Sequence, residues 1–273
     1  MTLTARTAHL GTSGIVQSIS RGSWDFLYRT STVRDPKWQI GHRAVLPDGR
    51  VFRYCKSAGQ CDTYIANVFY NAIPATGIDY SLLAAAAAVG DTEVVMTNQG
   101  TVAQTEDGLA GGNINFGVDN NLVQQRGIVG NTAGGVSDEI TIYLDAELVT
   151  ALTVADYAYC MPSPYSSVVG ATPAYDLDTG TWGRVGFVGY AAAGVTAADV
   201  YHWEQTWGLM PGASCFGAEV GKTQYHRDVY FRQDGSLIHR TAGAGDLYQR
   251  AGFIVDNNAE SNGATMIMLQ ISP

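Results

Sequence analysis

The tripeptide His202-Trp203-Glu204 places an imidazole and a carboxylate two positions apart, as in the H-x-E motif of zinc-dependent deaminases. That motif needs a P-C-x-x-C segment for its other zinc ligands, and here Pro211 is followed only by Cys215. Two ligands do not make a zinc site. The sequence therefore predicts no metal site. The other histidines are widely spaced and are expected to be ordinary surface or partly buried residues: His9, His42, His226 and His239.

Two loops resemble ligand-binding motifs but lack essential residues. Residues 217–223 are similar to a P-loop, yet three residues separate the glycines where four are required, and a strand or turn is expected to follow. Residues 176–180 resemble the start of a calcium loop, but Phe187 stands in the position of the bidentate glutamate. A tight turn explains residues 176–180 better, and we predict no cofactor.

The sequence also contains no recognisable catalytic set. It has no G-x-S-x-G nucleophile motif. A pair of carboxylates, as in a glycosidase, cannot be identified from strand spacing alone among the acidic residues Asp138, Glu139, Asp145 and Glu147. We predict no catalytic residue and a protein that is not an enzyme.

The composition is typical of an ordered, turn-rich protein that belongs to an assembly. Hydrophobic residues make up 46% of the 273 residues, and the chain contains 32 glycines and 15 tyrosines. Charged residues make up only 15%, below the roughly 25% of an average domain, so we expect another chain to cover part of the surface. No apolar stretch is long enough for a membrane span, no signal peptide begins the chain, and no membrane partner is expected.

Charge is unevenly distributed along the chain. The net charge is -9, but residues 1–43 contain six basic and two acidic residues, which gives +4 there and -13 in the rest. The acidic remainder repels phosphate backbones, so nucleic-acid binding by residues 44–273 is not expected. The four cysteines form no C-x-x-C pair, and free thiols are expected, with a bridge between Cys55 and Cys61 as the alternative.

The elements that would position any site are β-strands. Residues 42–55 and 229–239 are typical of two hairpins, each with an Asp-Gly turn, and the segments 93–97, 139–144, 184–190 and 264–271 have the length and pattern of strands. Residues 80–88, rich in alanine, are expected to form a short helix or a packed linker. The sequence therefore predicts an all-β protein, with a β-sandwich or β-barrel-like body that forms either one unit or two β subdomains.

The pattern divides the chain into four parts. Residues 1–40 lack a local core and carry three isolated aromatic residues, Trp24, Phe26 and Trp38, so an extended N-terminal arm that docks on a neighbour is expected. Residues 41–165 are expected to form the first part of the β-rich body and residues 184–273 the second. A Ser-, Gly- and Asp-rich loop over residues 166–183 is the expected seam.

Several segments, in order, resemble the decoration (cement) proteins of tailed-phage capsids. They are the Leu-Pro-Asp-Gly-Arg hairpin at 42–55, landmarks between 89 and 168 such as Ala110-Gly111-Gly112 and Pro162-Ser163-Pro164-Tyr165, the segment 201–208, and the closing elements from 234 to 271. The resemblance implies a structural protein of the outer capsid surface, assembled in the host cytoplasm. It would bind the major capsid protein of the expanded head, stabilise contacts between its subunits, and associate with itself, a trimer being favoured.

Binding to the capsid is expected to depend on contacts across a protein interface. Aromatic side chains would act as anchors and arginines as bidentate partners of coat carboxylates, and the arm offers five such residues: Arg21, Trp24, Arg29, Arg34 and Trp38. The alternative is a glycan-binding adsorption protein on the virion that uses Trp182, Trp203 and Trp207 as stacking platforms. Burial of those tryptophans in a core would argue against it.

Overall fold

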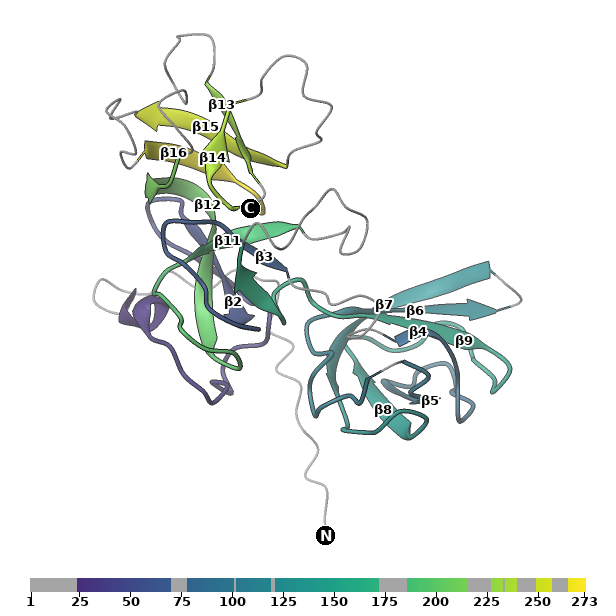
Figure 1. Cartoon of the computed structure of the whole chain (residues 1–273). Helices are drawn as coiled ribbons and strands as arrows, with labels where there is room; N and C mark the ends of the chain where they lie inside the picture. The colour runs from purple at the N-terminus through teal and green to yellow at the C-terminus, as the bar shows by residue number, and fades with distance from the viewer. Residues whose placement is uncertain are drawn as a thin grey trace. The chain divides into compact units, whose positions relative to one another are not determined.

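The computed structural model describes residues 24–69, 78–100, 102–118, 121–171, 186–215, 227–232, 234–239, 249–256 and 265–273. These residues form a short 3-10 helix, η1 (Trp24–Tyr28), and strands that pair antiparallel in two sheets (Figure 1). The prediction of an all-β protein is confirmed, and the barrel-like alternative is the one that the sheets adopt. No helix in the described ranges is long and apolar enough to cross a membrane.

The larger sheet has ten strands and curls into a half-barrel. Its order is β10-β3-β11-β12-β16-β15-β13-β14, and β2 joins β1 to β12. The thirteen-residue β12 is central because it pairs with β2, β11 and β16 along different parts of its length. The strands are β1 (Arg43–Val45), β2 (Val51–Lys56), β3 (Asn67–Phe69), β10 (Val168–Gly170), β11 (Phe187–Ala191), β12 (Tyr201–Ala213), β13 (Asp228–Phe231), β14 (Leu237–Ile238), β15 (Arg250–Asp256) and β16 (Thr265–Gln270).

The smaller sheet has six strands, in the order β4-β9-β6-β7-β8-β5, and forms a nearly closed barrel. A bridge between Leu83 and Met96 links the chain after β4 to β5, the two strands at the ends of this order. Alternate residues of these strands fill the interior, as the buried residues Ile114, Phe116 and Ile140 illustrate. The strands are β4 (Ile78–Leu82), β5 (Glu93–Thr97), β6 (Asn113–Val118), β7 (Asn121–Asn131), β8 (Glu139–Leu144) and β9 (Tyr157–Met161).

The chain forms two compact units, one for each sheet. The smaller unit contains the described residues from 78 to 163, and the larger unit contains those from 24 to 69 and from 164 onward. The predicted first part of the body, 41–165, is therefore divided between the two units. The reason is long-range strand pairing: β2 pairs with β12 and β3 pairs with β10 and β11, which joins residues 51–69 to the C-terminal half of the chain.

Both predicted hairpins are confirmed. In the first, β1 pairs with β2, Gly49 adopts a φ of +86°, and Asp48 accepts a hydrogen bond of 3.0 Å from the main-chain N–H of Arg50. In the second, β13 pairs with β14 and Gly235 has a φ of +75°. An Asp-Gly pair supplies these turns because its residues tolerate positive φ.

The alanine-rich segment 80–88 is a packed linker rather than a helix. β4 continues to Leu82, after which the main chains of Ala87 and Leu152 exchange hydrogen bonds of 2.9 and 2.8 Å. A nine-residue helix gains little by itself because nucleation is costly. Here the neighbouring strand segments satisfy the backbone groups instead, including the N–H of Ala84, which donates to Val95.

Gly252 on β15 is a position where only glycine fits. Its φ is +148°, and a Cβ there would overlap the main-chain oxygen of Met268 on β16. We expect Gly252→Ala to lower the free energy of unfolding by about 2 kcal/mol or more, since it adds both strain and a steric clash. Denaturant unfolding would measure the loss. Gly212→Ala is the control, because Gly212 has a φ of +86° but nothing within 4 Å of the added Cβ. Equal losses would contradict the steric argument.

Candidate functional site

Residues 24–40 pack on the chain's own larger sheet. Phe26 and Trp38 contact the buried Trp203 ring edge-on, with centroid distances of 5.2 and 5.5 Å, and Trp24 joins the same hydrophobic cluster. The main chains of Ser31 and Tyr201 exchange hydrogen bonds of 3.0 and 2.7 Å. This part of the predicted arm therefore places its aromatic residues in an intramolecular core rather than presenting them in an extended form.

The predicted capsid-binding residues differ in accessibility. Trp24 and Trp38 are half-buried in the cluster just described, Arg34 is half-buried, Arg29 is exposed, and Arg21 lies outside the described residues. Two apolar neighbours that the sequence analysis did not select, Tyr28 and Val33, are exposed at 54% and 73%. The sequence does not predict that these two side chains are exposed, because other apolar residues near them in the sequence are buried. The exposed residues of this segment therefore include Tyr28, Arg29 and Val33.

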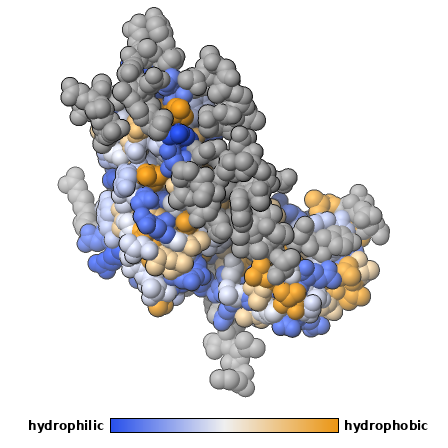
Figure 2. Space-filling view, viewed as in Figure 1, coloured by the Kyte–Doolittle hydropathy of each residue, from blue (hydrophilic) through white to orange (hydrophobic). Residues whose placement is uncertain are grey.

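The smaller unit is strongly acidic. Ala72–Ser163 contains eleven Asp and Glu residues and one basic residue, Arg126, so its formal charge is -10 and the rest of the chain sums to +1. Figure 2 shows orange apolar residues between blue ones on its visible face. Among the described residues of this unit, nine large apolar ones are exposed: Leu82, Val89, Val102, Leu122, Val123, Val136, Val149, Val154 and Met161. Apolar side chains within an acidic surface are available to a protein partner.

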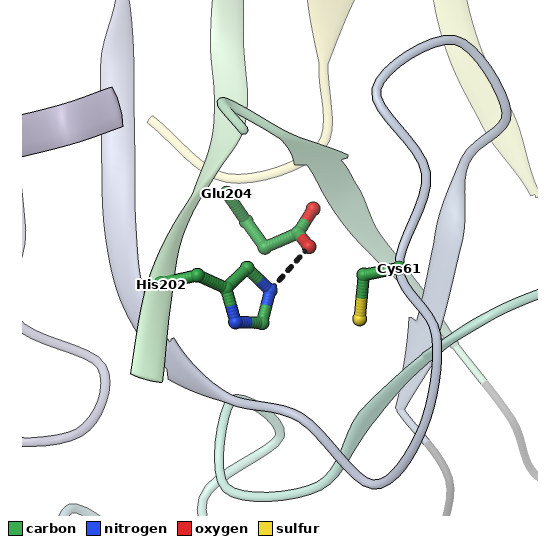
Figure 3. Close-up of side chains that lie close together, drawn as sticks. All are labelled: Cys61, His202 and Glu204. Atoms are coloured by element: carbon green, nitrogen blue, oxygen red, sulfur yellow. Dashed lines mark hydrogen bonds and ion pairs between the residues drawn. The ribbon is translucent and has the colours of Figure 1, made fainter. Parts of the chain in front are cut away.

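A second constellation is buried in the larger unit. His202 and Glu204 occupy alternate positions of β12 and so lie on the same face, with Nε2 of His202 2.8 Å from Oε1 of Glu204. Cys61 comes from the loop between β2 and β3, and Figure 3 shows its side chain next to the other two. The ligand atoms of the three residues lie within 4.8 Å of one another, and all three residues are buried. The sequence identified His202 and Glu204 but missed Cys61, because only the folded loop brings it there.

The surrounding chain holds these three side chains in place. Asn67 of β3 donates through Nδ2 to both carboxylate oxygens of Glu204, at 2.9 and 3.1 Å. Asn67 is itself fixed by Asp62, whose main-chain N–H donates to Oδ1 of Asn67 at 2.9 Å. The main chain of Cys61 forms an antiparallel bridge with Val195. Nδ1 of His202 lies 3.3 Å from the carbonyl oxygen of Val200, so Nε2 faces Glu204.

All four cysteines are free thiols, as predicted. Burial is the main cause that raises the pKa of each thiol, and for Cys55 and Cys61 the Glu204 carboxylate adds to it. Cys215 is the least buried, and its thiol is hydrogen-bonded to Oγ1 of Thr265 at 2.9 Å, which counteracts the rise.

Thiol reactivity is therefore expected to differ sharply between the cysteines. The reactive species is the thiolate, and a raised pKa together with burial keeps it scarce. In reduced, chelator-treated native protein, we expect iodoacetamide to modify Cys215 first and Cys55, Cys61 and Cys160 only slowly, as followed by peptide mass spectrometry. In denaturant all four should react at similar rates. Native labelling of Cys160 as fast as that of Cys215 would contradict this expectation.

Other sequence features have structural roles or lie outside the described residues. Asp138 and Asp145 accept main-chain hydrogen bonds from Gly135 and Gly127, at 2.7 and 2.9 Å. Trp203 is only 2% exposed, so it serves the core and offers no stacking platform, whereas Trp207 is half-buried. Segments 217–223 and 176–180, and Trp182, lie outside the described residues.

Comparisons of the chain with protein-family models, with curated proteins and with solved structures found no match.

Proposed function

We propose that the protein is a virion component, a capsid decoration protein that binds the outer surface of an expanded phage head and stabilises contacts between major capsid protein subunits. The ordered series of segments from residue 42 to residue 271 that resembles such proteins supports this proposal. The low content of charged residues, 15% of the chain, supports a role in an assembly.

The observation that carries the proposal is the surface chemistry of the smaller unit. The nine large apolar residues found exposed in its described part belong to a segment with a formal charge of -10. Protein interfaces combine an apolar centre with a polar rim, and complementary charge accelerates association. The fitting partner is a coat surface that carries basic residues around apolar ones. The acidic charge makes a nucleic-acid partner unfavourable.

The segment with Tyr28, Arg29 and Val33 supplies a second contact. The Arg29 guanidinium is exposed and can form bidentate hydrogen bonds with a coat carboxylate. Trp24 and Trp38 act indirectly here, because they fix this segment on the larger sheet through Trp203.

Co-sedimentation of purified protein with expanded, undecorated heads tests the proposal. We expect saturable binding that raises the temperature at which heads release DNA. The double variant Leu122→Ser/Val149→Ser, at residues exposed by 66% and 68%, should bind tenfold or more weakly, a loss of about 1.4 kcal/mol or more. The control Leu209→Ser/Val255→Ser changes exposed residues of the larger unit and should bind as the wild type does.

Deletions and single substitutions examine the N-terminal contact. Deletion of residues 1–23 keeps Trp24, Phe26 and Trp38, which pack in the aromatic cluster, whereas deletion of residues 1–40 removes them. Arg29→Ala should weaken binding severalfold, and Lys37→Ala, at another exposed basic residue, should not. Absence of saturable binding to heads would overturn the proposal.

Sedimentation equilibrium of the free protein tests the favoured trimer.

A further inference from the structure

We propose that Cys61, His202 and Glu204 bind one divalent transition-metal ion, Zn²⁺ by its ligand preferences, and that this ion ties the loop between β2 and β3 to β12. The three ligand types are those that zinc accepts in proteins, and a mixture of sulfur, imidazole nitrogen and carboxylate oxygen disfavours Mg²⁺ and Ca²⁺. The fourth position of the ion is left to a water molecule.

The distances are compatible with such an ion. The three ligand atoms already lie within 4.8 Å of one another, and donors around tetrahedral zinc are separated by about 3.3–3.7 Å. Nε2 of His202 and Oε1 of Glu204 are only 2.8 Å apart, so these two atoms would separate as the ion enters between the three ligands, and shifts on the order of 1 Å complete the coordination sphere. Figure 3 shows the three side chains beside one another, and the Cys61 thiol, which donates to the carbonyl oxygen of Val168 at 3.4 Å, would exchange this hydrogen bond for the ion.

The residues around the three ligands match the outer shell of a metal site. Protein-bound metals are usually held by a histidine whose other ring nitrogen contacts a carbonyl and by a carboxylate that accepts further hydrogen bonds. Nδ1 of His202 faces the carbonyl of Val200, and Asn67 donates to Glu204. Because Asn67 also holds the main chain of Asp62, one hydrogen-bond chain orients Glu204 and the loop that carries Cys61.

Charge balance gives a physical reason for an ion at this place. Glu204 is fully buried. Among the described residues, the basic side chain paired with it is His202. Arg53 lies opposite Glu204 in the register, but its guanidinium donates to Gly41, Ser272 and Pro273. A thiolate, a carboxylate and a neutral imidazole around a divalent cation sum to zero charge. The ion would thus neutralise a carboxylate that is otherwise costly to bury.

Cobalt substitution tests the site in the full-length chain. Reduced protein, freed of metal by a chelator and transferred to chelator-free buffer, is titrated with Co²⁺. We expect a thiolate-to-cobalt charge-transfer band and the visible bands of tetrahedral Co²⁺ to saturate at one ion per chain, and Zn²⁺ to remove them. Zn²⁺ should also raise the melting temperature by about 5 °C or more at saturating concentrations.

Cysteine variants identify the sulfur ligand. Cys61→Ser should lose the charge-transfer band and the thermal shift, whereas Cys215→Ser, the matched control in the same unit, should keep both. If Cys61→Ser does not fold, retention of the band in Cys55→Ser, Cys160→Ser and Cys215→Ser assigns the ligand to Cys61 by elimination. Absence of the band in the wild type, or its retention in folded Cys61→Ser, would overturn the proposal.

Discussion

Replacement of Trp203 by alanine is expected to lower the free energy of unfolding of the larger unit by about 3–5 kcal/mol. Trp203 is 2% exposed, and its ring contacts Phe26, Trp38 and Tyr54 at centroid distances of 5.1–5.5 Å. Truncation removes these aromatic contacts and leaves a cavity that a β-strand backbone cannot close. All five tryptophans lie outside residues 72–163, so tryptophan fluorescence during denaturation reports on the larger unit.

The same substitution should release residues 24–40 from the sheet. Besides their main-chain contacts, these residues are held by the packing of Phe26, Trp38 and Leu27 in the cluster around Trp203. Limited proteolysis of Trp203→Ala under native conditions is expected to cleave this segment at Arg29, Arg34 or Lys37 faster than in the wild type. Leu209→Ala, on the same strand but 43% exposed, should change stability by less than about 0.5 kcal/mol. Similar losses in both variants would contradict the central position of Trp203.

His202→Ala should destabilise the protein by about 3–5 kcal/mol even in the presence of a chelator. Glu204 has no solvent exposure, and Nε2 of His202 is 2.8 Å from its Oε1. Without the imidazole, the buried carboxylate keeps its hydrogen bonds from Asn67 but loses its partner at Nε2 of His202. Denaturant unfolding in chelator-containing buffer measures this loss separately from any contribution of a metal.

A double variant separates the charge effect from lost packing. Adding Glu204→Gln to His202→Ala removes the buried charge, so we expect it to restore about 1 kcal/mol or more of the lost stability. The exposed ion pair between Arg250 and Asp228 is the control, and Arg250→Ala should cost less than about 1 kcal/mol. If the double variant is less stable than His202→Ala, the carboxylate does not carry a buried charge.

The sequence by itself determined the local structure of this protein. Alternation of apolar residues predicted strands that the structure confirms, such as β5, β8 and β16, because side chains on opposite faces of a strand meet core and solvent in turn. The turns at Gly49 and Gly235 were predictable because an Asp-Gly pair tolerates the positive φ that they need. The all-β class followed from these elements.

The tertiary structure alone decided how distant segments combine. Residues 51–69 belong to the sheet of β12 because β2 and β3 pair with strands far later in the sequence, and local periodicity does not encode partners. For the same reason, the sequence did not show that Trp24 and Trp38 pack on the chain's own Trp203. The sequence also identified only two candidate ligands, His202 and Glu204, where a zinc site needs four. Cys61, the third ligand that we propose, comes close to them only because a loop fixed by Val195 and Asn67 brings it there.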